Sequence, residues 1–397
     1  MKLAFTIGPL NLRGGAGLTA AAAGLGRALA SGHGAALSVF GRGGRSATDP
    51  VLWGPLASVR ESGAGAGLSS MLASGDFDVV HSHGLWLGHQ WGAWRAGRRR
   101  SMFRVISAQG HLDSWAWRRS VMKKKLAWLL YQQAALQSAG CLHALHEGEV
   151  ASFRAVGLKN PVCVIPNGID PAPTATVEPP WLGQIAPGGR VLLFLGRVAE
   201  QKGAADLVAG WAEVIRVSAV SRGNWKLVIA GWPEPATLKC IRQLVAEHRL
   251  QDSVCVLGPQ SGAAKDACLA HADAFVLPSR SEGLPMAVLE AWSRGLPVAM
   301  TDACNLPVGF SRRAAFRIVN EPGRLAAGLS EFLAMPTTRL EEMGQEGKRL
   351  SAAEFSWSSV ASRMMEVYRW GLGQGPAPST LRFQELPAPQ TVGAGGR

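Results

Sequence analysis

The alternation of short apolar runs with longer amphipathic stretches is what most constrains the fold of this 397-residue chain. Short apolar runs indicate buried strands, the stretches between them carry helical periodicity, and their alternation is typical of βαβ units with parallel sheets. The series occurs twice, before and after a segment with five prolines, PAPTATVEPPWLGQIAPGG. The chain also exceeds the ~250–300 residues at which one hydrophobic core stops growing. The sequence therefore predicts an α/β protein with two Rossmann-like, doubly wound domains facing each other across a central cleft.

Each series supplies six expected strands, and helical patterns lie between most of them. The strands are Leu3–Ile7, Ala36–Phe40, Val79–His81, Arg104–Ser107, Cys141–Ala144 and Val162–Ile165, then Val191–Leu195, Lys226–Ala230, Val254–Leu257, Ala274–Leu277, Pro297–Met300 and Arg317–Val319. The main helices are Leu18–Ala30, Trp115–Ser138, Ala204–Val217, Ala236–Glu247, Ala263–Ala272 and Pro285–Ser293. Ligands of open α/β sheets bind beyond the carboxyl ends of the strands. We therefore expect the loops at 196–203 and 279–286, which both follow strands, to meet at one site.

Composition shifts along the chain set the expected domain boundaries. The first domain covers residues 1–168, a proline-rich linker 169–189, and the second domain 190–354. An amphipathic helix at 355–370 closes the fold. The remainder, 371–397, is rich in Gly and Pro with little periodicity, so we expect a disordered tail.

Cysteine usage and the apolar segments indicate a cytoplasmic protein. The six cysteines are scattered with no C-x-x-C pair, which is typical of reduced thiols and not of a disulfide or zinc framework. MKLAFTIGPL resembles a signal peptide superficially, but its apolar run is too short and no small-residue cleavage site follows. LTAAAAGLGRALA is interrupted by Arg27 and two glycines, so it cannot supply the ~20 apolar residues of a membrane span. We expect a soluble or peripheral protein.

The net charge of +13 is concentrated in the first half of the chain. Residues 1–170 hold 18 Lys+Arg and 8 Asp+Glu, or +10, and the remainder holds 23 and 20, or +3. Two runs are dense in basic residues, 95–104 and 117–128, and the second interleaves aromatic and aliphatic residues with its lysines. That mixture suits either a helix lying on an anionic membrane surface or a solvated basic face. No nucleic-acid-binding module is recognisable, so we expect no nucleic-acid partner.

The stretch SRSEGLPMAVLEAWSRGLP, residues 279–297, carries the most specific local chemistry. Glu282 precedes a helix expected to begin at Leu284 or Pro285, and Glu290 lies inside that helix. Eight helical residues rise roughly 12 Å, whereas the paired carboxylates of a glycoside hydrolase stand about 5 to 9.5 Å apart. The two acids therefore suit different parts of one long ligand. Between them, the free amides of a helix N-terminus favour an anion such as a diphosphate.

A family resemblance begins at VLLFLGRVAEQKG, residues 191–203. A strand ending in Gly-Arg, a Lys-Gly pair shortly after it and an E-x7-E stretch that begins E-G-L-P together resemble the retaining glycosyltransferases of family 4, which have the GT-B fold. VIPNGID (164–170) is similar to the interdomain linker of that family, and DVVHSHGLW (78–86) to a strand of its N-terminal domain. The resemblance covers about residues 1–370.

The resemblance implies a donor site in the second domain. Arg197 and Lys202 would hold the donor diphosphate and neutralise the charge that develops on the leaving group. Glu282 would bind hydroxyls of the transferred sugar, and Glu290 those of the ribose. Residues after Leu257, including Pro259, would line the base pocket. The remaining expected donor-binding residues are glycines and first-turn residues: Gly15, Gly17, Gly196, Gly258, Gly283, Leu284 and Met286.

The first domain would supply the acceptor side. Of the two histidines at the end of the strand within DVVHSHGLW, His81 and His83, we expect His83 to face the cleft and to join the catalytic set. Many relatives carry His or Arg where this chain has Gln109; its amide can hydrogen-bond a sugar hydroxyl but cannot carry a proton. His111 and Asp113, close by in sequence, are further acceptor-side candidates.

Two motifs in the first domain also match the patterns of other protein classes. The loop GGAG at 14–17, directly after the first expected strand, would bring the backbone close to the donor phosphates. It also begins a literal G-x-G-x-x-A, the dinucleotide fingerprint, but that match is weak because no acid follows the second expected strand to bind a ribose. Asp76-Phe77-Asp78 matches the D-x-D of a metal-dependent GT-A enzyme, yet it immediately precedes a buried strand and is expected to begin it.

Together these observations predict a metal-independent retaining transferase that moves a hexose from a nucleotide diphosphate sugar, its co-substrate, to an acceptor hydroxyl. No other cofactor is expected. The acceptor would be a saccharide or lipid-linked saccharide in exopolysaccharide or lipopolysaccharide assembly, with the enzyme in the cytoplasm or peripheral on the inner membrane face. Three alternatives remain: a GT-B sugar-nucleotide phosphorylase or epimerase, a non-catalytic donor-binding or membrane-associated partner of another transferase, and a dehydrogenase suggested by the glycine loop.

Overall fold

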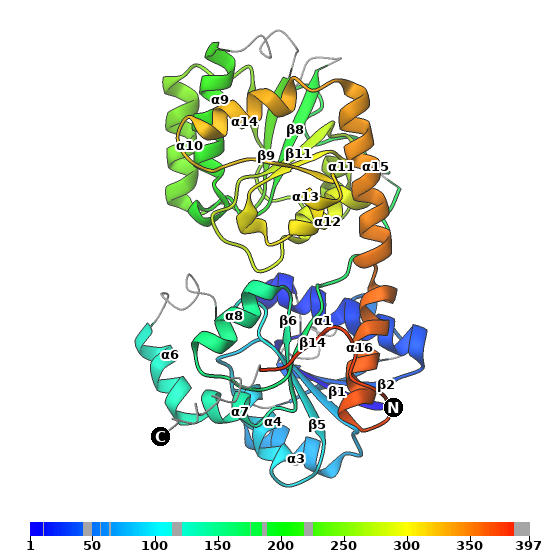
Figure 1. Ribbon diagram of the computed structural model, residues 1–397. Helices are drawn as coiled ribbons and strands as arrows, with labels where there is room; N and C mark the ends of the chain where they lie inside the picture. The colour runs from blue at the N-terminus through cyan, green and yellow to red at the C-terminus, as the bar shows by residue number, and fades with distance from the viewer. Residues whose placement is uncertain are drawn as a thin grey trace, which may run out of the picture. The chain divides into compact units, whose positions relative to one another are not determined.

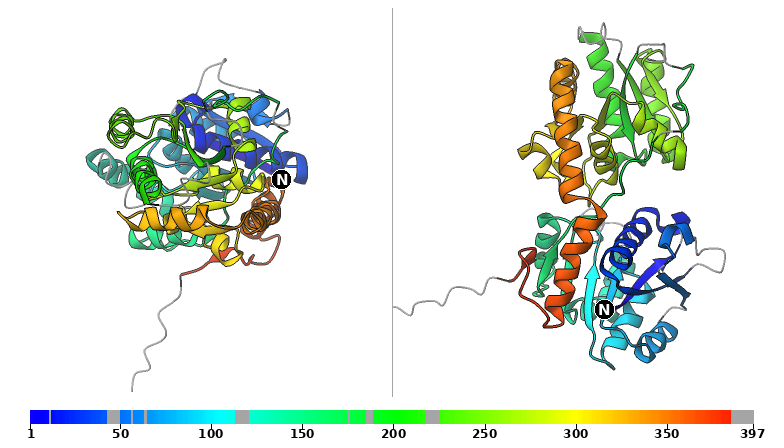
Figure 2. Two further views of the ribbon diagram at one scale, coloured as in Figure 1. Left: turned by 90° about the horizontal axis from the view of Figure 1, so that it is seen from above. Right: turned by 90° about the vertical axis from the view of Figure 1, so that its right-hand side faces the viewer.

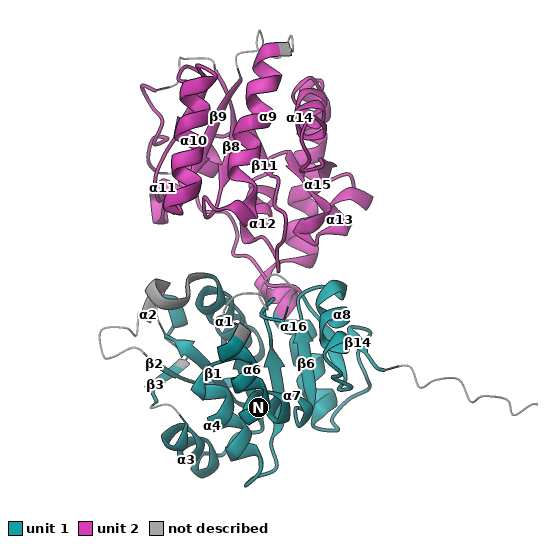
Figure 3. Cartoon of the chain, turned by 90° about the vertical axis from the view of Figure 1, so that its left-hand side faces the viewer, with its two compact units in different colours: residues 1–165, 361–397 teal, residues 166–360 magenta. Residues whose placement is uncertain are grey.

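The computed structural model divides into two compact units (Figure 3). Unit 1 comprises residues 1–165 and 361–397, and unit 2 comprises residues 166–360. The structure describes residues 1–10, 12–42, 50–55, 57–62, 65–112, 121–174, 176–184, 189–217 and 225–384. Both units are α/β, with helices on both faces of a central sheet (Figures 1 and 2). Residues 169–189, expected as a linker, belong to unit 2.

Unit 1 is built on an eight-stranded sheet in the order β14-β7-β6-β5-β4-β1-β2-β3. All neighbouring pairs are parallel except β14 with β7. Its strands are β1 (Lys2–Pro9), β2 (Ala36–Arg42), β3 (Ala57–Glu61), β4 (Val79–His83), β5 (Phe103–Ser107), β6 (Cys141–Ala144), β7 (Val162–Val164) and β14 (Leu381–Arg382). Its helices are α1 (Leu12–His33), α2 (Pro50–Trp53), α3 (Ala66–Ser74), α4 (Gly88–Gly97), α6 (Val121–Ala127), a π-helical turn (Trp128–Gln132), α7 (Gln133–Gln137), α8 (Glu147–Ala155) and α16 (Trp357–Gly371), whose first residues fall in unit 2.

Unit 2 is built on a six-stranded parallel sheet in the order β10-β9-β8-β11-β12-β13. Its strands are β8 (Arg190–Leu195), β9 (Trp225–Ala230), β10 (Val254–Val256), β11 (Ala274–Leu277), β12 (Val298–Met300) and β13 (Ala315–Arg317). Its helices are a 3-10 turn (Glu200–Lys202), α9 (Ala204–Val217), α10 (Pro235–Glu247), α11 (Gly262–Ala270), α12 (Met286–Ser293), a second 3-10 turn (Asp302–Cys304), α13 (Pro307–Ser311), α14 (Arg324–Leu333) and α15 (Thr337–Glu354).

The strand order of each unit fixes where a ligand can bind. In unit 2 the chain winds outward from β8 through β9 to β10 and then returns to β11 on the other side of β8. In unit 1 it winds from β1 to β3 and returns to β4 beside β1. A crevice opens at such a switch point because the two following loops leave in opposite directions. The loops after β8 and β11, and those after β1 and β4, are therefore the sites that the topology provides.

Burial on both faces explains why the central strands are continuous apolar runs. All four residues of β11 and five of the six residues of β8 are buried. Large side chains from the flanking helices complete the core of unit 2, including Trp211 from α9 and Trp292 from α12, both fully buried. No helix among the described residues is long and apolar enough to cross a membrane.

Several expected elements are corrected by the structure. Helix α1 begins at Leu12, so the glycines at 14–17 lie in its first turns and not in a loop; glycine disfavours helix, which hid these turns from sequence periodicity. The sequence missed β3 because it is an edge strand with mostly exposed side chains. Strand β13 begins two residues earlier than expected.

The expectation of a disordered tail from residue 371 is wrong for the part described. Strand β14 pairs antiparallel with β7, where Leu381 faces Cys163 and is 7% exposed. Arg382 adds an ion pair to Glu147 at 2.7 Å. A two-residue strand gives too little periodicity to be seen in sequence, and residues 385–397 lie outside the described residues.

A buried chain of hydrogen bonds crosses three adjacent strands of unit 1, β4, β5 and β6, and ends at the residue after β7. Tyr368 Oη lies 2.7 Å from His81 Nδ1, His81 Nε2 lies 2.6 Å from Ser107 Oγ, and Ser107 Oγ lies 2.6 Å from His143 Nδ1. His143 Nε2 ends the chain 2.7 Å from the carbonyl oxygen of Ile165. Because a carbonyl can only accept, His143 Nε2–H must donate, and each earlier bond then has one direction, starting with the Tyr368 hydroxyl.

This chain attaches α16 to the centre of the sheet and predicts a stability change on removing one hydroxyl. Tyr368→Phe leaves His81 Nδ1 buried without its donor, so we expect a loss of about 1–3 kcal/mol in the free energy of unfolding. Tyr131→Phe is the matched control, because this half-buried tyrosine makes no hydrogen bond among the described residues. Urea denaturation of both variants measures the difference, and equal stability would contradict the directed chain.

Candidate functional site

Close backbone contacts hold together the two loops at the switch point of unit 2. Gly203 has φ of 69°, and a side chain there would begin 2.3 Å from the carbonyl oxygen of Pro278, so only glycine fits. Gln201 donates through Nε2 to the carbonyl of Ser281 at 2.9 Å, and its own carbonyl accepts from the amide of Arg280 at 2.8 Å. The loops at 196–203 and 279–286 therefore meet, as the sequence predicts.

Lys202 and Glu282 form a buried ion pair between these loops. Lys202 Nζ lies 2.5 and 2.6 Å from the two carboxylate oxygens of Glu282. Ser279 Oγ donates to the same carboxylate at 2.6 Å, and Asn305 donates to the carbonyl of Glu282 at 2.5 Å. The side chains of Lys202 and Glu282 are only 17% and 6% exposed. Sequence reasoning placed both at the donor but did not foresee that they neutralise each other.

Arg197 differs from Lys202 in having no close ionic partner in the described part of the chain. It follows Gly196 directly after β8, and its side chain is 53% exposed. Its one described ion pair, to Glu234, is long at 3.8 Å between NH1 and Oε1. An exposed guanidinium at the switch point, paired this weakly, can be recruited by an anion at little cost to the fold.

Helix α12 begins at Met286, with Pro285 as its N-cap, slightly later than expected. Among the described residues, the backbone amides of its first turn and of the preceding loop, those of Gly283, Leu284, Met286 and Ala287, have no backbone acceptor. Free amides at a helix N-terminus suit an anion. They lie directly beside Glu282 in the same loop.

Glu290 and Gly258 are the other residues that the family resemblance assigns to the donor. Glu290 Oε1 accepts from Lys265 Nζ of α11 at 2.7 Å, and no described hydrogen bond ends on Oε2. No sequence pattern pointed to this lysine, which is 25 residues away from Glu290. Gly258 follows β10 and is exposed, as is Pro259, and the carbonyl of Gly258 accepts from the amide of Gly231 at 3.1 Å.

In unit 1, the histidines of β4 are buried. His83 is 1% exposed, and its ring stacks on that of His81 at a centroid distance of 4.2 Å. Alternation along the strand does put both on one face, as expected. His83 does not face open space, however, because Phe5 of β1 packs against it at 4.7 Å. Burial, followed by the nearby His143 and His89, lowers the pKa of His83 to about 3, so the ring is neutral.

The Gln109 turn is held by an acid that sequence reasoning missed. Glu149 of α8 is fully buried and accepts from the amides of Gly110 at 2.6 Å and Leu145 at 2.7 Å. Gln109 has φ of 54°, a left-handed conformation that is uncommon outside glycine. The only sequence signal was an acid in the first turn of a helix after a strand, which is also typical of ordinary capping.

His111 is fixed in one tautomer. Its Nδ1 accepts from the amide of Leu85 at 3.0 Å, so the proton of the neutral ring is on Nε2. Burial, with a smaller contribution from Lys124, lowers the pKa of His111 to about 4. Gly84, whose φ is 79°, lies against this ring: a side chain there would begin 3.3 Å from His111 Cε1. The structure thus brings His111 to the end of β4.

The structure says less about the other site residues expected in unit 1. Asp113 lies outside the described residues. Gly15 and Gly17 lie in the first turns of α1, which follows β1 at the switch point of unit 1, so any role with phosphate would use a helix N-terminus.

The D-x-D string is structural. Asp76 pairs with Lys2 at 2.7 Å and Arg100 at 3.0 Å, and Asp78 accepts from the amide of Lys2 at 2.7 Å, before β4 begins. Among the described residues, no group of three or more His, Cys, Asp and Glu side chains is arranged to hold a metal ion.

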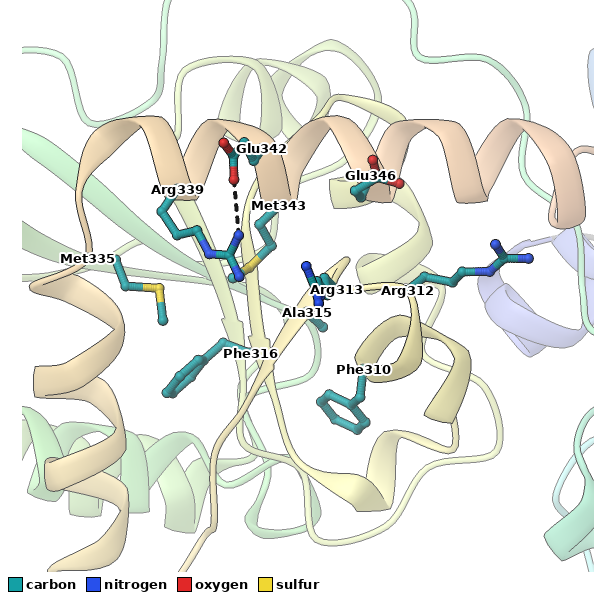
Figure 4. A pocket seen from close by; sticks show the side chains of 10 residues that line it. All are labelled: Phe310, Arg312, Arg313, Ala315, Phe316, Met335, Arg339, Glu342, Met343 and Glu346. Atoms are coloured by element: carbon teal, nitrogen blue, oxygen red, sulfur yellow. Dashed lines mark hydrogen bonds and ion pairs between the residues drawn. The ribbon is translucent and has the colours of Figure 1, made fainter.

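A separate cavity of about 460 Å³ lies in unit 2 between α13, β13 and α15 (Figure 4). Arg339 and Glu342 pair at its rim at 3.0 Å. It contains none of the predicted site residues, and its lining is Phe310, Arg312, Arg313, Ala315, Phe316, Met335, Arg339, Glu342, Met343 and Glu346.

Comparison with known proteins decides the family. The model "Glycosyl transferases group 1" matches residues 183–350, and "Glycosyl transferase 4-like domain" matches residues 16–168. Together the two matches cover most of the chain. The chain belongs to the group 1 glycosyltransferases. The family resemblance predicted from the motifs is confirmed, and so is the GT-B fold of two parallel-sheet units.

Individual relatives of this glycosyltransferase are distant. A "D-inositol 3-phosphate glycosyltransferase" of Jonesia denitrificans is 26% identical over 74% of this chain and 72% of the relative. A "GDP-mannose:cellobiosyl-diphosphopolyprenol alpha-mannosyltransferase" of Xanthomonas campestris is 28% identical over 77% of each chain. Among solved structures, a sucrose-phosphate synthase from Thermosynechococcus elongatus has a TM-score of 0.75 and 19% identity, over 94% of this chain and 100% of that one. Anabaena HepE in complex with UDP and glucose has a TM-score of 0.70 and 16% identity, over 92% and 99%.

The burial of the donor-side ion pair predicts a difference between two lysine variants. Lys202→Ala leaves the carboxylate of Glu282 buried and uncompensated, so we expect a loss of about 3–5 kcal/mol in the free energy of unfolding. Lys265→Ala breaks the more exposed pair with Glu290 and is expected to cost less than about 1 kcal/mol. Chemical denaturation of both variants checks this, and a similar cost for the two would refute the buried pair.

The buried histidines predict acid sensitivity of unit 1. Burial lowers the pKa of His83 to about 3 and of His89, His111 and His143 to about 4. Below the unfolded value of ~6.5 the unfolded chain binds protons that the folded unit does not, so stability is complete above that pH and falls as pH drops toward 4. Each such group contributes about 1.4 kcal/mol per pH unit in that window.

Hydrogen exchange at pH 7.5, 6 and 5, corrected for the intrinsic rate, measures this effect unit by unit. We expect peptides of unit 1 to lose protection first. Unit 2 is an internal control, because its histidines, His248 and His271, are both exposed. Earlier loss of protection in unit 2 would contradict the assignment.

Proposed function

We propose that this glycosyltransferase moves a hexose from a nucleotide diphosphate sugar to an acceptor hydroxyl, with retention of configuration and without a metal ion. The observation that carries the proposal is the Lys202–Glu282 pair at the switch point of unit 2, with Arg197 and the first turn of α12 beside it. It offers an exposed cation, free amides and a carboxylate already held in place. A sugar diphosphate needs these three groups.

Each part of the donor has a partner in this proposal. Arg197 and the amides of Gly283 and Met286 bind the diphosphate, since both supply donors to phosphate oxygens. Glu282 accepts from hydroxyls of the hexose. Glu290 accepts from ribose hydroxyls through Oε2, the oxygen that Lys265 leaves unused. The exposed backbone at Gly258 borders the base.

The proposed reaction uses the leaving group as the base. The bond between the anomeric carbon and the phosphate oxygen breaks, the acceptor oxygen bonds to that carbon on the same face, and the acceptor proton passes to the departing phosphate oxygen. Glu282 is a poor nucleophile, because Lys202 contacts both of its oxygens and Ser279 donates to one. Catalysis is then mainly stabilisation of the leaving phosphate by Arg197, Lys202 and the α12 amides.

The acceptor that we propose is a lipid-linked saccharide, bound by the unit 1 edge that carries Gln109 and His111, in cell-surface polysaccharide assembly on the cytoplasmic face of a membrane. Two observations support it. The Xanthomonas relative is named for a diphosphopolyprenol-linked saccharide. The excess positive charge lies in the first half of the chain, which suits a substrate presented at an anionic surface.

The donor is identified by thermal-shift measurements with UDP-, GDP- and ADP-sugars, since a ligand that binds the folded state raises its melting temperature with concentration. We expect one base to stand out, with a smaller shift for the nucleotide alone. Products after incubation without an acceptor then separate transfer from a phosphorylase or epimerase. An absence of glycosyl transfer to any acceptor, with donor binding intact, would favour a non-catalytic donor-binding protein instead.

Arg197→Ala is the clean kinetic test. We expect kcat/KM to fall by several orders of magnitude, because the guanidinium neutralises charge that develops in the transition state. Its exposure means that stability should be unchanged, unlike that of Lys202→Ala. Arg242→Ala, another exposed arginine of unit 2, is the matched control with normal kinetics. Near-normal turnover of Arg197→Ala, or activity abolished by chelator and restored by Mg²⁺, would overturn the proposal.

A further inference from the structure

The helix formed by α6, the π-helical turn and α7, residues 121–137, has an exposed apolar face. Met122 is 84% exposed, Leu126 59%, Leu129 77% and Leu130 68%. These positions follow the i, i+4, i+7, i+8 spacing of one helix face. Lys123 and Lys125 lie beside them, both exposed and without an ion pair among the described residues. The other exposed large apolar residues of the described chain are scattered.

The opposite face of the same helix contacts one residue, Trp86, through three side chains. Lys124 Nζ lies 5.7 Å from the centroid of the Trp86 ring, and the Trp128 ring lies 6.3 Å from it. Gln132, fully buried, accepts through Oε1 from the backbone amide of Trp86 at 2.9 Å. Three successive turns of one helix therefore contact a single residue at the end of β4.

The π-helical turn makes this alignment possible. In an α-helix, positions four apart drift by about 40° around the axis, so three such positions spread over about 80°. Here the amide of Gln133 donates to the carbonyl of Trp128, five residues back. The wider turn absorbs the drift between Trp128 and Gln132 and returns Gln132 to the face that carries Lys124.

The turn that the helix grips is strained. Trp86 has φ of 69°, which is a genuine outlier for a bulky residue. Strain of this kind persists only where the surroundings impose it, and it is concentrated at functional sites. The preceding amide in the same turn, that of Leu85, donates to Nδ1 of His111. The helix therefore contacts a turn that, through its neighbouring residue Leu85, binds His111, one of the residues to which we assign the acceptor.

We propose that the apolar face of helix 121–137 docks on an anionic bilayer and that docking stabilises the Leu85–Trp86 turn through Gln132. The inference builds on the proposed lipid-linked acceptor. An apolar stripe flanked by unpaired lysines is the arrangement of a helix that lies in a membrane interface, with its lysines at the headgroups. Docking fixes the helix, and the fixed helix holds the acceptor turn in its strained conformation.

Vesicle flotation tests the docking surface. We expect the wild-type protein to float with vesicles that contain phosphatidylglycerol and not with phosphatidylcholine vesicles. Met122→Asp/Leu126→Asp and Lys123→Glu/Lys125→Glu should each reduce the bound fraction at least tenfold. Leu182→Asp and Lys239→Glu are matched controls, because both residues are exposed in unit 2, Leu182 at 62%. Equal binding of all variants, or equal binding to neutral vesicles, would refute the surface.

Hydrogen exchange tests the link to the turn. Anionic vesicles should slow exchange at least fivefold in peptides covering both 121–137 and 84–88. In Gln132→Ala, protection of the helix should remain and protection of the turn should be lost. Gln132→Glu keeps an accepting oxygen and should restore it. Unchanged exchange at 84–88 on vesicle binding, or full protection in Gln132→Ala, would overturn the link.

Both measurements report on binding and exchange and need no turnover, so they stand even if the proposed transfer reaction fails. Sedimentation without lipid tests the alternative that a second copy of the chain, and not a bilayer, binds the apolar face. Self-association of the wild type that Met122→Asp/Leu126→Asp abolishes would assign the face to a second copy of the chain and overturn the bilayer proposal.

Discussion

The ion pair between Lys202 and Glu282 is the interaction on which the switch-point loops of unit 2 depend. Neither charge can be buried alone, because desolvation costs several kcal/mol per ion. Each is tolerated because the other lies within 2.6 Å, and the two loops must therefore stay together. The return of the chain to β11 beside β8 brings an acid 80 residues away to the lysine. The sheet topology brings the two side chains together, and their electrostatic attraction holds the two loops in contact.

In unit 1, side-chain acceptors hold the backbone amides of the loops after β4 and β5. The amides of Leu85, Trp86 and Gly110 each donate to a side chain from another element: His111, Gln132 and Glu149. Side-chain acceptors fix backbone conformations that the residues themselves disfavour, such as φ of 69° at Trp86. The buried hydrogen-bond chain from Tyr368 to Ile165 links the strands that precede these loops.

The sequence predicted the layout of both sheets because central parallel strands are buried on both faces and form uninterrupted apolar runs. β6, β11 and α9 match their expected bounds, and the errors fall at edges such as β3, β13 and β14, where few side chains are buried. Motifs also singled out Lys202 and Glu282, which the structure brings into contact. Sequence patterns did not predict three contacts: Lys202 with Glu282, Glu149 with Gly110, and Gln132 with Trp86. These contacts join residues that are 80, 39 and 46 positions apart, and no local pattern reports contacts over such separations.

The glutamine at position 109 is consistent with a reaction in which the leaving group takes the proton. An amide can donate and accept hydrogen bonds but does not take up or release a proton near neutral pH. His111, two residues along the chain, is a titratable candidate, yet its Nδ1 already accepts from Leu85, and its pKa of about 4 leaves the ring neutral with the proton on Nε2. To accept a second proton, the ring would have to break the bond that holds the acceptor turn. Both residues are therefore suited to orienting an acceptor hydroxyl, which agrees with the proposed route, in which the departing phosphate oxygen of the donor takes the proton.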